Sequence, residues 1–434
     1  MTTTPAYAPP VLADRAGANF FIAAVIFALF VGAALVSAER KDITQGFDEV
    51  AHVSYVAEIQ HTGSIWPDLE KMRLLDPRTF EFTSKANYLN HPSIFYALLA
   101  FAGPPLEGHP GALLADRLIN IAIAACGFAA LLGLALAARL PRYEFYAYAV
   151  PLACIPVLAP IAGAVNNDNL AFLGGALTLL GAWQTLASGR GGWFALALVG
   201  VIVAGWAKLT GLALTGAMAG TIVVYLIWRR RWRWSWTIGA ALAFLVAAAP
   251  YILLMMQYGS PAPATAGQIA MLKSDAQTLG LDALPRKSFA AYLGYFLVGF
   301  IVEWMPALSP RSVLNYAMLA IPVAALICAL AGTALALRRL WRRQETALDV
   351  VTVAGMASLA ATFALHLRHS YADHLATGWL MEAYPRYYLP LVAVVPLAGL
   401  SLLAAVQSPR WRTGLLAFLV ASPIIFRIFG APLG

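Results

Sequence analysis

The feature that most constrains this chain is a series of long apolar runs separated by short polar segments. A helix needs about 20 apolar residues to cross the roughly 30 Å hydrocarbon core of a bilayer. Eleven runs approach or exceed this length: 19–37, 113–138, 143–163, 169–187, 192–208, 211–228, 235–256, 314–337, 349–366, 387–405 and 412–429. We therefore expect residues 1–434 to form a single all-α, polytopic transmembrane domain of about eleven spans.

Composition supports a membrane protein and argues against other classes. Of the 434 residues, 61% are hydrophobic and 12% are charged, whereas about a quarter of the residues of a soluble domain are charged. The formal net charge is +8, but the basic residues occur in short clusters between apolar runs, where membrane topology explains them. We expect membrane lipids as partners and no nucleic acid.

The basic clusters also determine the expected topology, because positively charged residues favour the cytoplasmic side. Two shorter apolar stretches, 92–103 and 290–306, are expected to lie at the outer interface as juxtamembrane or re-entrant helices. With eleven spans and an inner N-terminus, every cluster then falls inside: Arg15, Arg139 with Arg142, Arg190, Arg229 to Arg233, Arg338 to Arg343, and Arg410 with Arg412.

This topology leaves two long segments outside, a first external loop (38–112) and a second external segment with an interfacial helix (257–313). Nearly every polar residue with useful chemistry falls in these segments or in short outer turns. We therefore expect a multi-pass protein of the cytoplasmic (inner) membrane whose active site lies on the external, periplasmic face.

The first external loop opens with a candidate acid–base group. On a helix, Asp48 and Glu49 would share a face with His52, which follows them by four and three residues. Apolar residues at 50, 53, 56 and 57 predict an amphipathic helix lying on the membrane. A carboxylate beside an imidazole suits a general base with its orienting partner, or two ligands of a divalent cation. The alternative is a solvated helix start, where the helix dipole favours acidic residues.

A run of four polar residues, Asn166, Asn167, Asp168 and Asn169, follows at the outer junction of two spans. One of them would be enough to cap a helix. Four of them also supply amide donors and a carboxylate that could meet a sugar hydroxyl or a metal ion. Both interpretations stay open at this point.

Two cations lie where the topology does not explain them. Lys208 interrupts an apolar stretch at the outer end of a span, and Arg386 enters a span among tyrosines that include Tyr387. An ionisable residue at membrane depth is costly and marks a functional site by default, although a lysine near a helix end can snorkel to the interface. Tyrosines alone would indicate an interfacial belt. Both cations suit the binding of a phosphate group.

Weaker candidates occur elsewhere in the external segments. His91 precedes a proline at the start of the first short stretch and fits a structural role as well as a catalytic one. Glu303 interrupts the second stretch. The last outer loop adds groups that could surround a substrate or a metal, although a solvated loop explains most of them: His366, His369, Asp373, His374 and Glu382.

Some motifs are absent from the sequence. It contains no Gly-x-x-x-x-Gly-Lys-Ser/Thr loop, no glycine-rich dinucleotide fingerprint and no Gly-x-Ser-x-Gly elbow. A nucleotide-driven pump and an enzyme with a cytosolic nucleotide-sugar domain are therefore not expected, and we expect no nucleotide cofactor.

Taken in order, the motifs resemble those of the GT-C class of integral-membrane glycosyltransferases, which includes protein O-mannosyltransferases and the lipid A aminoarabinose transferase. The resemblance covers most of the chain and rests on short motifs: Asp48-Glu49-x-x-His52, His91-Pro92, Asp116-Arg117-Leu118, Asn166-Asn167-Asp168, Lys208-x-Thr210-Gly211 and Arg386-Tyr387-Tyr388-Leu389-Pro390. It implies a GT-C-like fold, hexosyl or pentosyl transfer from a polyprenyl-phosphate-linked donor, an inverting mechanism and often a divalent cation.

Together with the chemistry of the residues, the resemblance implies roles. Asp48 is the expected base, Glu49 the alternative base, and Asp168 a further catalytic carboxylate. The remaining groups are expected to bind the donor phosphate (Lys208, Arg386, Tyr387), the substrates (Asn166, Asn167, His91, Glu303) and a divalent cation, Mg, Mn or Ca (His52, Asp168). The acceptor would be a lipid, a glycan or a protein. The competing interpretations are a transporter or flippase of lipid-linked sugars and a metal-independent glycan ligase.

Overall fold

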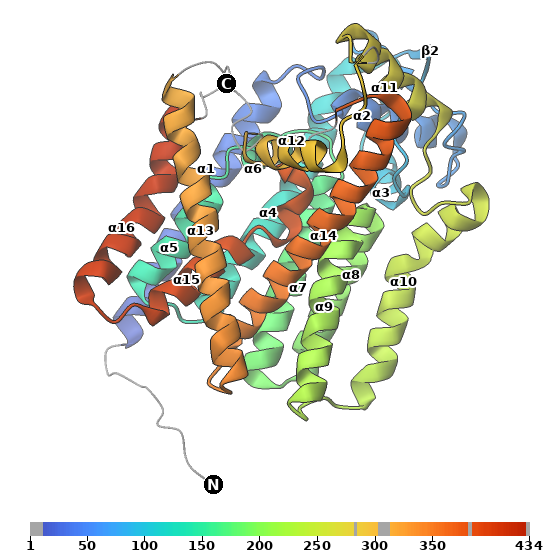
Figure 1. Cartoon of the computed structure of the whole chain (residues 1–434). Coiled ribbons are helices and arrows are strands. Elements are labelled where there is room, and N and C mark those ends of the chain that lie inside the picture. Colours follow the sequence, from blue (N-terminus) through green and yellow to red (C-terminus); the bar gives the residue numbers. More distant parts are fainter. Residues whose placement is uncertain (1–11, 282–283, 303–312, 381–383, 431–434) are drawn as a thin grey trace.

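The computed structural model describes residues 12–281, 284–302, 313–380 and 384–430, which fold mainly as helices (Figure 1). The longer helices form a bundle: α1 (Leu12–Arg40), α4 (Leu113–Ala137), α7 (Asp168–Ser188), α8 (Gly191–Ala207), α9 (Leu209–Trp228), α10 (Ser235–Tyr258), α13 (Val313–Trp341), α14 (Ala347–Thr377), α15 (Val394–Ala405) and α16 (Pro409–Ile425). Shorter elements complete the fold: α2 (Glu49–Thr62), β1 (Arg73–Leu75), β2 (Phe82–Ala86), α3 (Ile94–Ala102), η1 (Pro110–Ala112), α5 (Arg142–Ala153), α6 (Leu158–Ala162), α11 (Ala266–Thr278), α12 (Phe289–Val302), η2 (Pro385–Leu391) and η3 (Phe426–Gly430).

The bundle is that of a multi-pass membrane protein. Among the described residues, eight helices are long and apolar enough to cross a bilayer, or up to nine if η2 and α15, which meet at a bend of 61°, form one span. The predicted all-α polytopic architecture is therefore confirmed, but the predicted number of eleven spans is not.

Nine spans in the described ranges are two fewer than the eleven predicted, and the two missing spans correspond to two segments. The predicted span 143–163 is divided into α5 and α6 by a break at residues 154–157, which includes Pro156, a residue that cannot donate a backbone hydrogen bond. The predicted span 192–208 corresponds to α8, which has 17 residues and is about 26 Å long at 1.5 Å per residue. It is thus shorter than a hydrocarbon core of roughly 30 Å.

The elements of the segment 38–112 gather with α11 at one end of the bundle and form with it what we call the outer layer (Figure 1). The strands β1 and β2 form an antiparallel hairpin in which Leu75 pairs with Phe82. Helix α3 has nine residues, about 14 Å at the usual rise, which is too short to cross a bilayer. Together with residues of α8, α9 and α10, these elements enclose a second hydrophobic core, distinct from the main core of the bundle.

Helix α2 differs from the amphipathic helix that the sequence predicts. Its polar and apolar residues alike are buried from Glu49 to Ile59, except Val50. The hairpin covers one side, where the Leu75 N–H donates to Ser54 Oγ at 2.8 Å, and α3 packs on another side, where the rings of Tyr55 and Tyr96 stack at 4.0 Å. The helix therefore lies inside the outer layer and not on the membrane surface.

Ion pairs place arginine clusters together at the opposite end of the bundle. Arg229, after α9, pairs with Glu345, after α13, at 2.5 Å. Arg412 of α16 pairs with Glu144 of α5 at 2.7 Å. The basic loops that follow α9 and α13 therefore share one end, as the topology predicts. Their assignment to the cytoplasm rests on the positive-inside rule.

Close packing of α7 positions η2, the short helix that carries Arg386. A Cβ atom at Gly175 of α7 would overlap the carbonyl oxygen of Pro390 in η2. On the adjoining face, a Cβ at Gly174 would lie 2.7 Å from the carbonyl oxygen of Gly200 in α8. Small residues are common where membrane helices approach this closely.

We predict that Gly175→Ala displaces η2 and destabilises the protein by about 1–3 kcal/mol, the usual cost of overpacking. The measurement is the thermal unfolding midpoint in detergent. Gly133→Ala is the matched control, because a Cβ there meets no atom within 4 Å. Equal midpoints for the two variants would contradict the packing constraint.

Candidate active site

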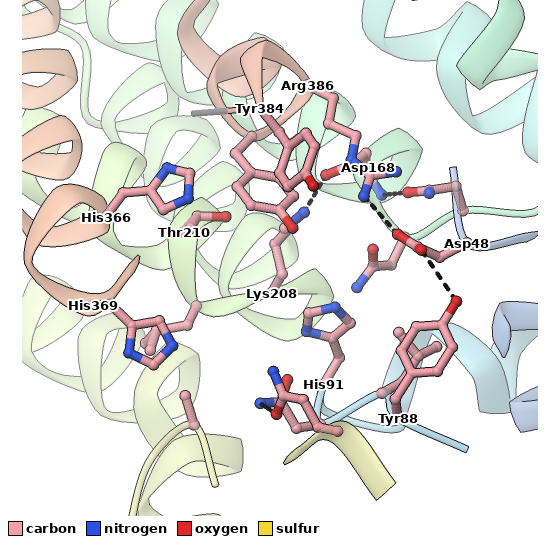
Figure 2. Close-up of a pocket in the computed structure, with 18 of the residues that line it drawn as sticks. Asp48, Tyr88, His91, Asp168, Lys208, Thr210, His366, His369, Tyr384 and Arg386 are labelled. Carbon is pink, nitrogen blue, oxygen red and sulfur yellow. Dashed lines mark hydrogen bonds and ion pairs between the residues drawn. The ribbon is translucent and has the colours of Figure 1, made fainter. Parts of the chain in front are cut away.

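A cavity of about 920 Å³ lies where the outer layer meets the bundle. It is lined by the start of α2, the segment 88–92, the start of α7, the α8–α9 junction, α11, α14 and η2 (Figure 2). Most of the residues singled out in the sequence contribute to its wall: Asp48, His52, His91, Asn166, Asn167, Asp168, Lys208, Arg386 and Tyr387. Glu49 does not line it, and Glu303 lies outside the described residues.

Asp48 is held towards the cavity by an unusual backbone. Gly46, Phe47 and Asp48 have φ angles of 86°, 62° and 58°, a left-handed conformation that is costly for residues other than glycine and often marks a functional site. Arg386 Nη2 donates to Asp48 Oδ2 at 2.5 Å, and the Tyr88 hydroxyl donates to Asp48 Oδ1 at 3.1 Å. The carboxylate is thus fixed by two donors from distant parts of the chain.

The environment of Asp48 favours its ionised form. Burial alone would raise the pKa of the carboxyl group, but the charge of Arg386 and the hydrogen bonds from Arg386 and Tyr88 lower its pKa to about 2. Its side chain keeps 37% of its surface exposed. Asp48 is therefore a carboxylate at neutral pH and is accessible from the cavity.

Lys208 lies beside this pair. It is the single non-helical residue between α8 and α9, with an extended backbone (φ −166°, ψ 158°), and its side chain is buried in an ion pair with Asp168. Its Nζ lies 4.0 Å from the ring centroid of Tyr387, and Arg386 Cζ lies 5.4 Å from the same centroid. Tyr387 therefore contacts both cations through cation–π interactions.

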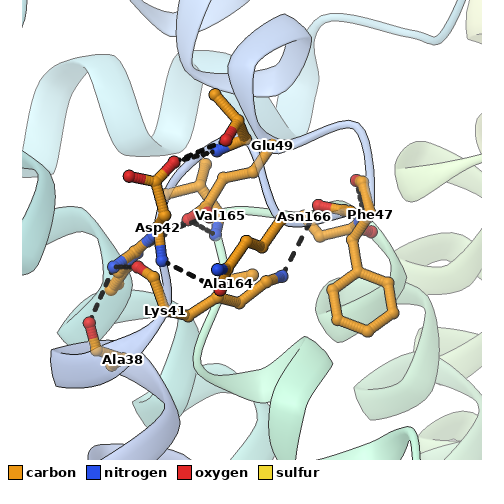
Figure 3. Close-up of polar contacts among 12 residues, drawn as sticks. Ala38, Lys41, Asp42, Phe47, Glu49, Ala164, Val165 and Asn166 are labelled. Carbon is orange, nitrogen blue, oxygen red and sulfur yellow. Dashed lines mark hydrogen bonds and ion pairs between the residues drawn. The ribbon is translucent and has the colours of Figure 1, made fainter. Parts of the chain in front are cut away.

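The asparagines before α7 connect the walls of the cavity. Asn166 Nδ2 donates to the Phe47 carbonyl at 2.8 Å (Figure 3), and Asn166 Oδ1 accepts from the Asp168 N–H at 2.7 Å. Asn167 Nδ2 donates to the Ala207 carbonyl at 3.0 Å. These bonds fix the strained turn at Phe47 and the residue before Lys208. The two side chains predicted to bind substrate thus also hold the charged groups in place.

The predicted metal site does not fit these residues. In His52, Nδ1 lies 2.9 Å from the Tyr96 hydroxyl and Nε2 lies 3.1 Å from Asn166 Nδ2, so both ring nitrogens are engaged. Asp168 is engaged by Lys208. No group of three or more His, Cys, Asp or Glu side chains in the described ranges could hold a metal ion. We therefore derive no catalytic step through a metal.

His91 forms part of the cavity wall below Asp48 in Figure 2. Burial lowers the pKa of its imidazole to about 3, so the ring is neutral at physiological pH. It stacks on His52 with ring centroids 6.3 Å apart, and its carbonyl accepts from the Tyr55 hydroxyl at 3.2 Å. A neutral ring can exchange hydrogen bonds with a substrate without adding charge.

Glu49, the alternative base of the sequence analysis, is located elsewhere. Its carboxylate accepts two hydrogen bonds from Arg117, at 2.8 and 2.7 Å, and one from the Val165 N–H at 2.8 Å. Arg117 also donates to the carbonyls of Ala38 and Lys41 at 2.7 and 2.9 Å (Figure 3). The side chain of Glu49 is fully buried in this network. It is not available to accept a proton from a substrate in the cavity.

Several residues in or next to the site have no role that the sequence predicts. Arg117 stands within one of the resemblance motifs, but the sequence does not show that it pairs with Glu49. Tyr88, three residues before His91, and the α11 residues Gln268 and Asp275 also line the cavity. In the sequence, the one indication that these three residues could belong to the site is their position in the two predicted external segments.

No family model matches the sequence, and no curated protein matches it. The solved structures that are similar to this chain include two of one protein. ArnT from Cupriavidus metallidurans bound to undecaprenyl phosphate is 16% identical over 81% of this chain and 78% of that chain, with a TM-score of 0.38. The same protein in the apo state is 15% identical over 83% and 78%, with a TM-score of 0.37. ArnT is the lipid A aminoarabinose transferase, a GT-C glycosyltransferase. Similarity at this level does not assign an activity to this chain.

We predict that Glu49→Gln destabilises the protein by about 3–5 kcal/mol, because it leaves Arg117 buried without a counter-ion. Thermal unfolding in detergent measures the loss. The double variant Glu49→Gln, Arg117→Met should recover part of it. Glu144→Gln, which breaks the more exposed pair with Arg412, is the control and should cost less than about 1 kcal/mol. A loss at position 49 no larger than in this control would refute the buried-pair assignment.

Proposed function

We propose that this protein is a glycosyltransferase that moves a sugar from a polyprenyl-phosphate donor to an acceptor hydroxyl at the external face of the cytoplasmic membrane, with inversion at the anomeric carbon. The observation that carries the proposal is the arrangement of Lys208 and Arg386 around Tyr387, next to the ionised Asp48, in one cavity at the end of a membrane bundle.

The two cations supply a phosphate site. Each is paired with one carboxylate, but each keeps further donors: Arg386 Nε is buried without a hydrogen-bond partner among the described residues, and an ammonium group has three N–H donors. A cation at membrane depth is costly unless it has ion-pair partners or a ligand. A lipid-linked phosphate fits, because its charge suits both groups and its chain belongs in the membrane.

Apolar residues of the same cavity suit the lipid part of the donor. Leu209 and Ala213 of α9 line it near Lys208, and Met271 and Leu272 of α11 line another side. A chain of isoprene units has no hydrogen-bonding groups and would contact such side chains or the surrounding lipid. The phosphate would then meet Lys208 and Arg386.

Asp48 is the proposed base. Its carboxylate would take the proton of the acceptor hydroxyl while the acceptor oxygen bonds to the anomeric carbon. The bond between that carbon and the phosphate oxygen breaks, and its electron pair stays on the polyprenyl phosphate. Lys208 and Arg386 would stabilise the charge that gathers there. Displacement from the opposite side inverts the anomeric centre.

The Asp48–Arg386 pair couples donor binding to this step. Alone, Asp48 is a weak base, because Arg386 holds its pKa at about 2. A phosphate that accepts hydrogen bonds from Arg386 competes with Asp48 for the same cation. The pKa of Asp48 then rises towards its ordinary value, so the base becomes stronger only when the donor is present.

Variants of the two cations test the phosphate site. The double variant Lys208→Ala, Asp168→Asn removes the cation without leaving a buried carboxylate unpaired. We expect it, and Arg386→Ala, to weaken the binding of undecaprenyl phosphate by about tenfold or more, the usual cost of a lost charged hydrogen bond. Arg410→Ala is the control, at an exposed position outside the cavity. Binding that is unchanged in both cation variants would exclude the phosphate site.

Asp48→Asn tests the base. We expect sugar transfer from a polyprenyl-phosphate donor to fall by about 100-fold or more, while binding of undecaprenyl phosphate stays equal or tightens, because Arg386 loses its competing carboxylate. The purified variant is incubated with donor and native membranes, and the modified product is quantified by mass analysis. Transfer at the wild-type rate would reject Asp48 as the base.

A further inference from the structure

The cavity has a second polar wall that the proposed chemistry does not use. It consists of Thr362, His366, His369 and Asp373 of α14, together with Thr210 of α9, and we call it the α14 wall. In Figure 2, His366 and His369 lie on the side opposite Asp48 and Tyr88, with Lys208 and Thr210 between the two sides. The sequence predicts an outer loop for His366, His369 and Asp373, but they lie in the C-terminal part of helix α14, and Thr362 lies near its middle.

Unsatisfied polar atoms gather in the α14 wall. Four buried atoms have no hydrogen-bond partner within the described ranges: Thr210 Oγ1, Thr362 Oγ1, His366 Nε2 and Asp373 Oδ2. Asp373 Oδ2 has only a distant contact with His369 Nε2, at 3.6 Å. Most buried polar atoms in proteins are hydrogen-bonded, and exceptions require an explanation. Here all four belong to residues that line one cavity.

The hydroxyl of Thr362 differs from those of Ser358 and Thr377 in its own helix, which donate to the carbonyl four residues earlier. One turn earlier, Ser358 Oγ donates to the Ala354 carbonyl at 2.7 Å, and in α13 Thr333 Oγ1 donates to the Ala329 carbonyl at 2.7 Å. Serine and threonine inside helices commonly make this bond. Thr362 does not make it, so its hydroxyl remains able to bond a group that enters the cavity.

One ring nitrogen of His366 is hydrogen-bonded, and the other has no hydrogen-bond partner among the described residues. Its Nδ1 lies 3.0 Å from the Tyr388 hydroxyl, which leaves Nε2 for a ligand. Its ring lies 5.1 Å from the ring of Tyr387, and Tyr387 in turn lies 4.0 Å from Lys208 Nζ. The ring of Tyr387 therefore contacts both His366 of the α14 wall and Lys208, the cation that would bind the phosphate.

We propose that the α14 wall binds the hydroxyl groups of the donor sugar. This inference rests on the proposed function, which places the phosphate at Lys208 and Arg386. A sugar ring bonded to that phosphate would extend about the width of one ring from it, and a single ring, that of Tyr387, contacts both Lys208 and His366. Hydroxyl, imidazole and carboxylate groups together donate and accept hydrogen bonds, as a ring with several hydroxyl groups requires.

Binding measurements with two kinds of probe test the proposal. The full-length protein in nanodiscs is titrated with undecaprenyl phosphate and with undecaprenyl-phosphate-linked mannose, glucose, galactose and arabinose. In the wild type, at least one sugar-bearing lipid should bind about tenfold more tightly than undecaprenyl phosphate, the gain expected from one or two added hydrogen bonds. If none does, the α14 wall has no role in sugar binding.

Two variants of His366 distinguish the roles of its two ring nitrogen atoms. Glutamine places its amide near the position of Nε2, whereas asparagine places its amide near that of Nδ1. We expect His366→Asn and Thr362→Val to abolish the preference for the sugar-bearing lipid and to leave the affinity for undecaprenyl phosphate unchanged. His366→Gln should keep part of the preference. Thr333→Val is the matched control for Thr362→Val, because Thr333 lies outside the cavity.

The outcomes distinguish the two proposals. Loss of affinity for every lipid in the Lys208→Ala, Asp168→Asn variant, together with an unchanged preference in His366→Asn and Thr362→Val, would retain the phosphate site and overturn the sugar subsite. The same would follow if the α14 variants raised only the KM for the acceptor. Unchanged affinity for undecaprenyl phosphate in the Lys208 double variant and in Arg386→Ala would overturn the proposed function itself.

Discussion

The buried ion pair of Glu49 and Arg117 is the constraint on which the outer part of this structure depends. Arg117 is also bonded to the carbonyls that end α1, and Glu49 is also bonded to the backbone before α7. One pair thereby joins α1, α2, α4 and the loop that leads into α7. Because removal of either partner would leave a charge without compensation in a dry interior, the start of α2 is held in a single position, and the strained turn that presents Asp48 is held with it.

The general fold and the location of the charged groups were predictable from the sequence because both follow from solvation. Apolar runs of sufficient length must cross the membrane, and ionisable residues at membrane depth must have partners or ligands. The cost of a charge at membrane depth indicated Lys208 and Arg386, the spacing to His52 indicated Asp48, and a polar run between two spans indicated Asp168. Each residue was indicated separately, and the sequence carries no comparable signal for which cation meets which carboxylate.

The features that sequence reasoning missed depend on packing between distant segments. The valines of α2 predicted a membrane-facing stripe, but the hairpin and α3 cover that stripe from both sides. Proline can bend or interrupt a span without changing its hydropathy, so the break between α5 and α6 was not apparent. Thr210 and Thr362 are ordinary residues of apolar helices, and what distinguishes them is the cavity beside them and the lack of a hydrogen-bond partner among the described residues.

The bond between Asp48 and Arg386 joins residues that are 338 positions apart, and this affects the order in which the protein is made. At about 5–20 residues per second, a ribosome adds Arg386 roughly 20–70 s after Asp48. During that interval the segment 38–112 can fold around Glu49 and Arg117, but Asp48 has no counter-ion and the cavity has no η2 wall. The site is completed only when a late segment of the chain is inserted, so a truncated or stalled chain would present Asp48 without the arginine that organises it.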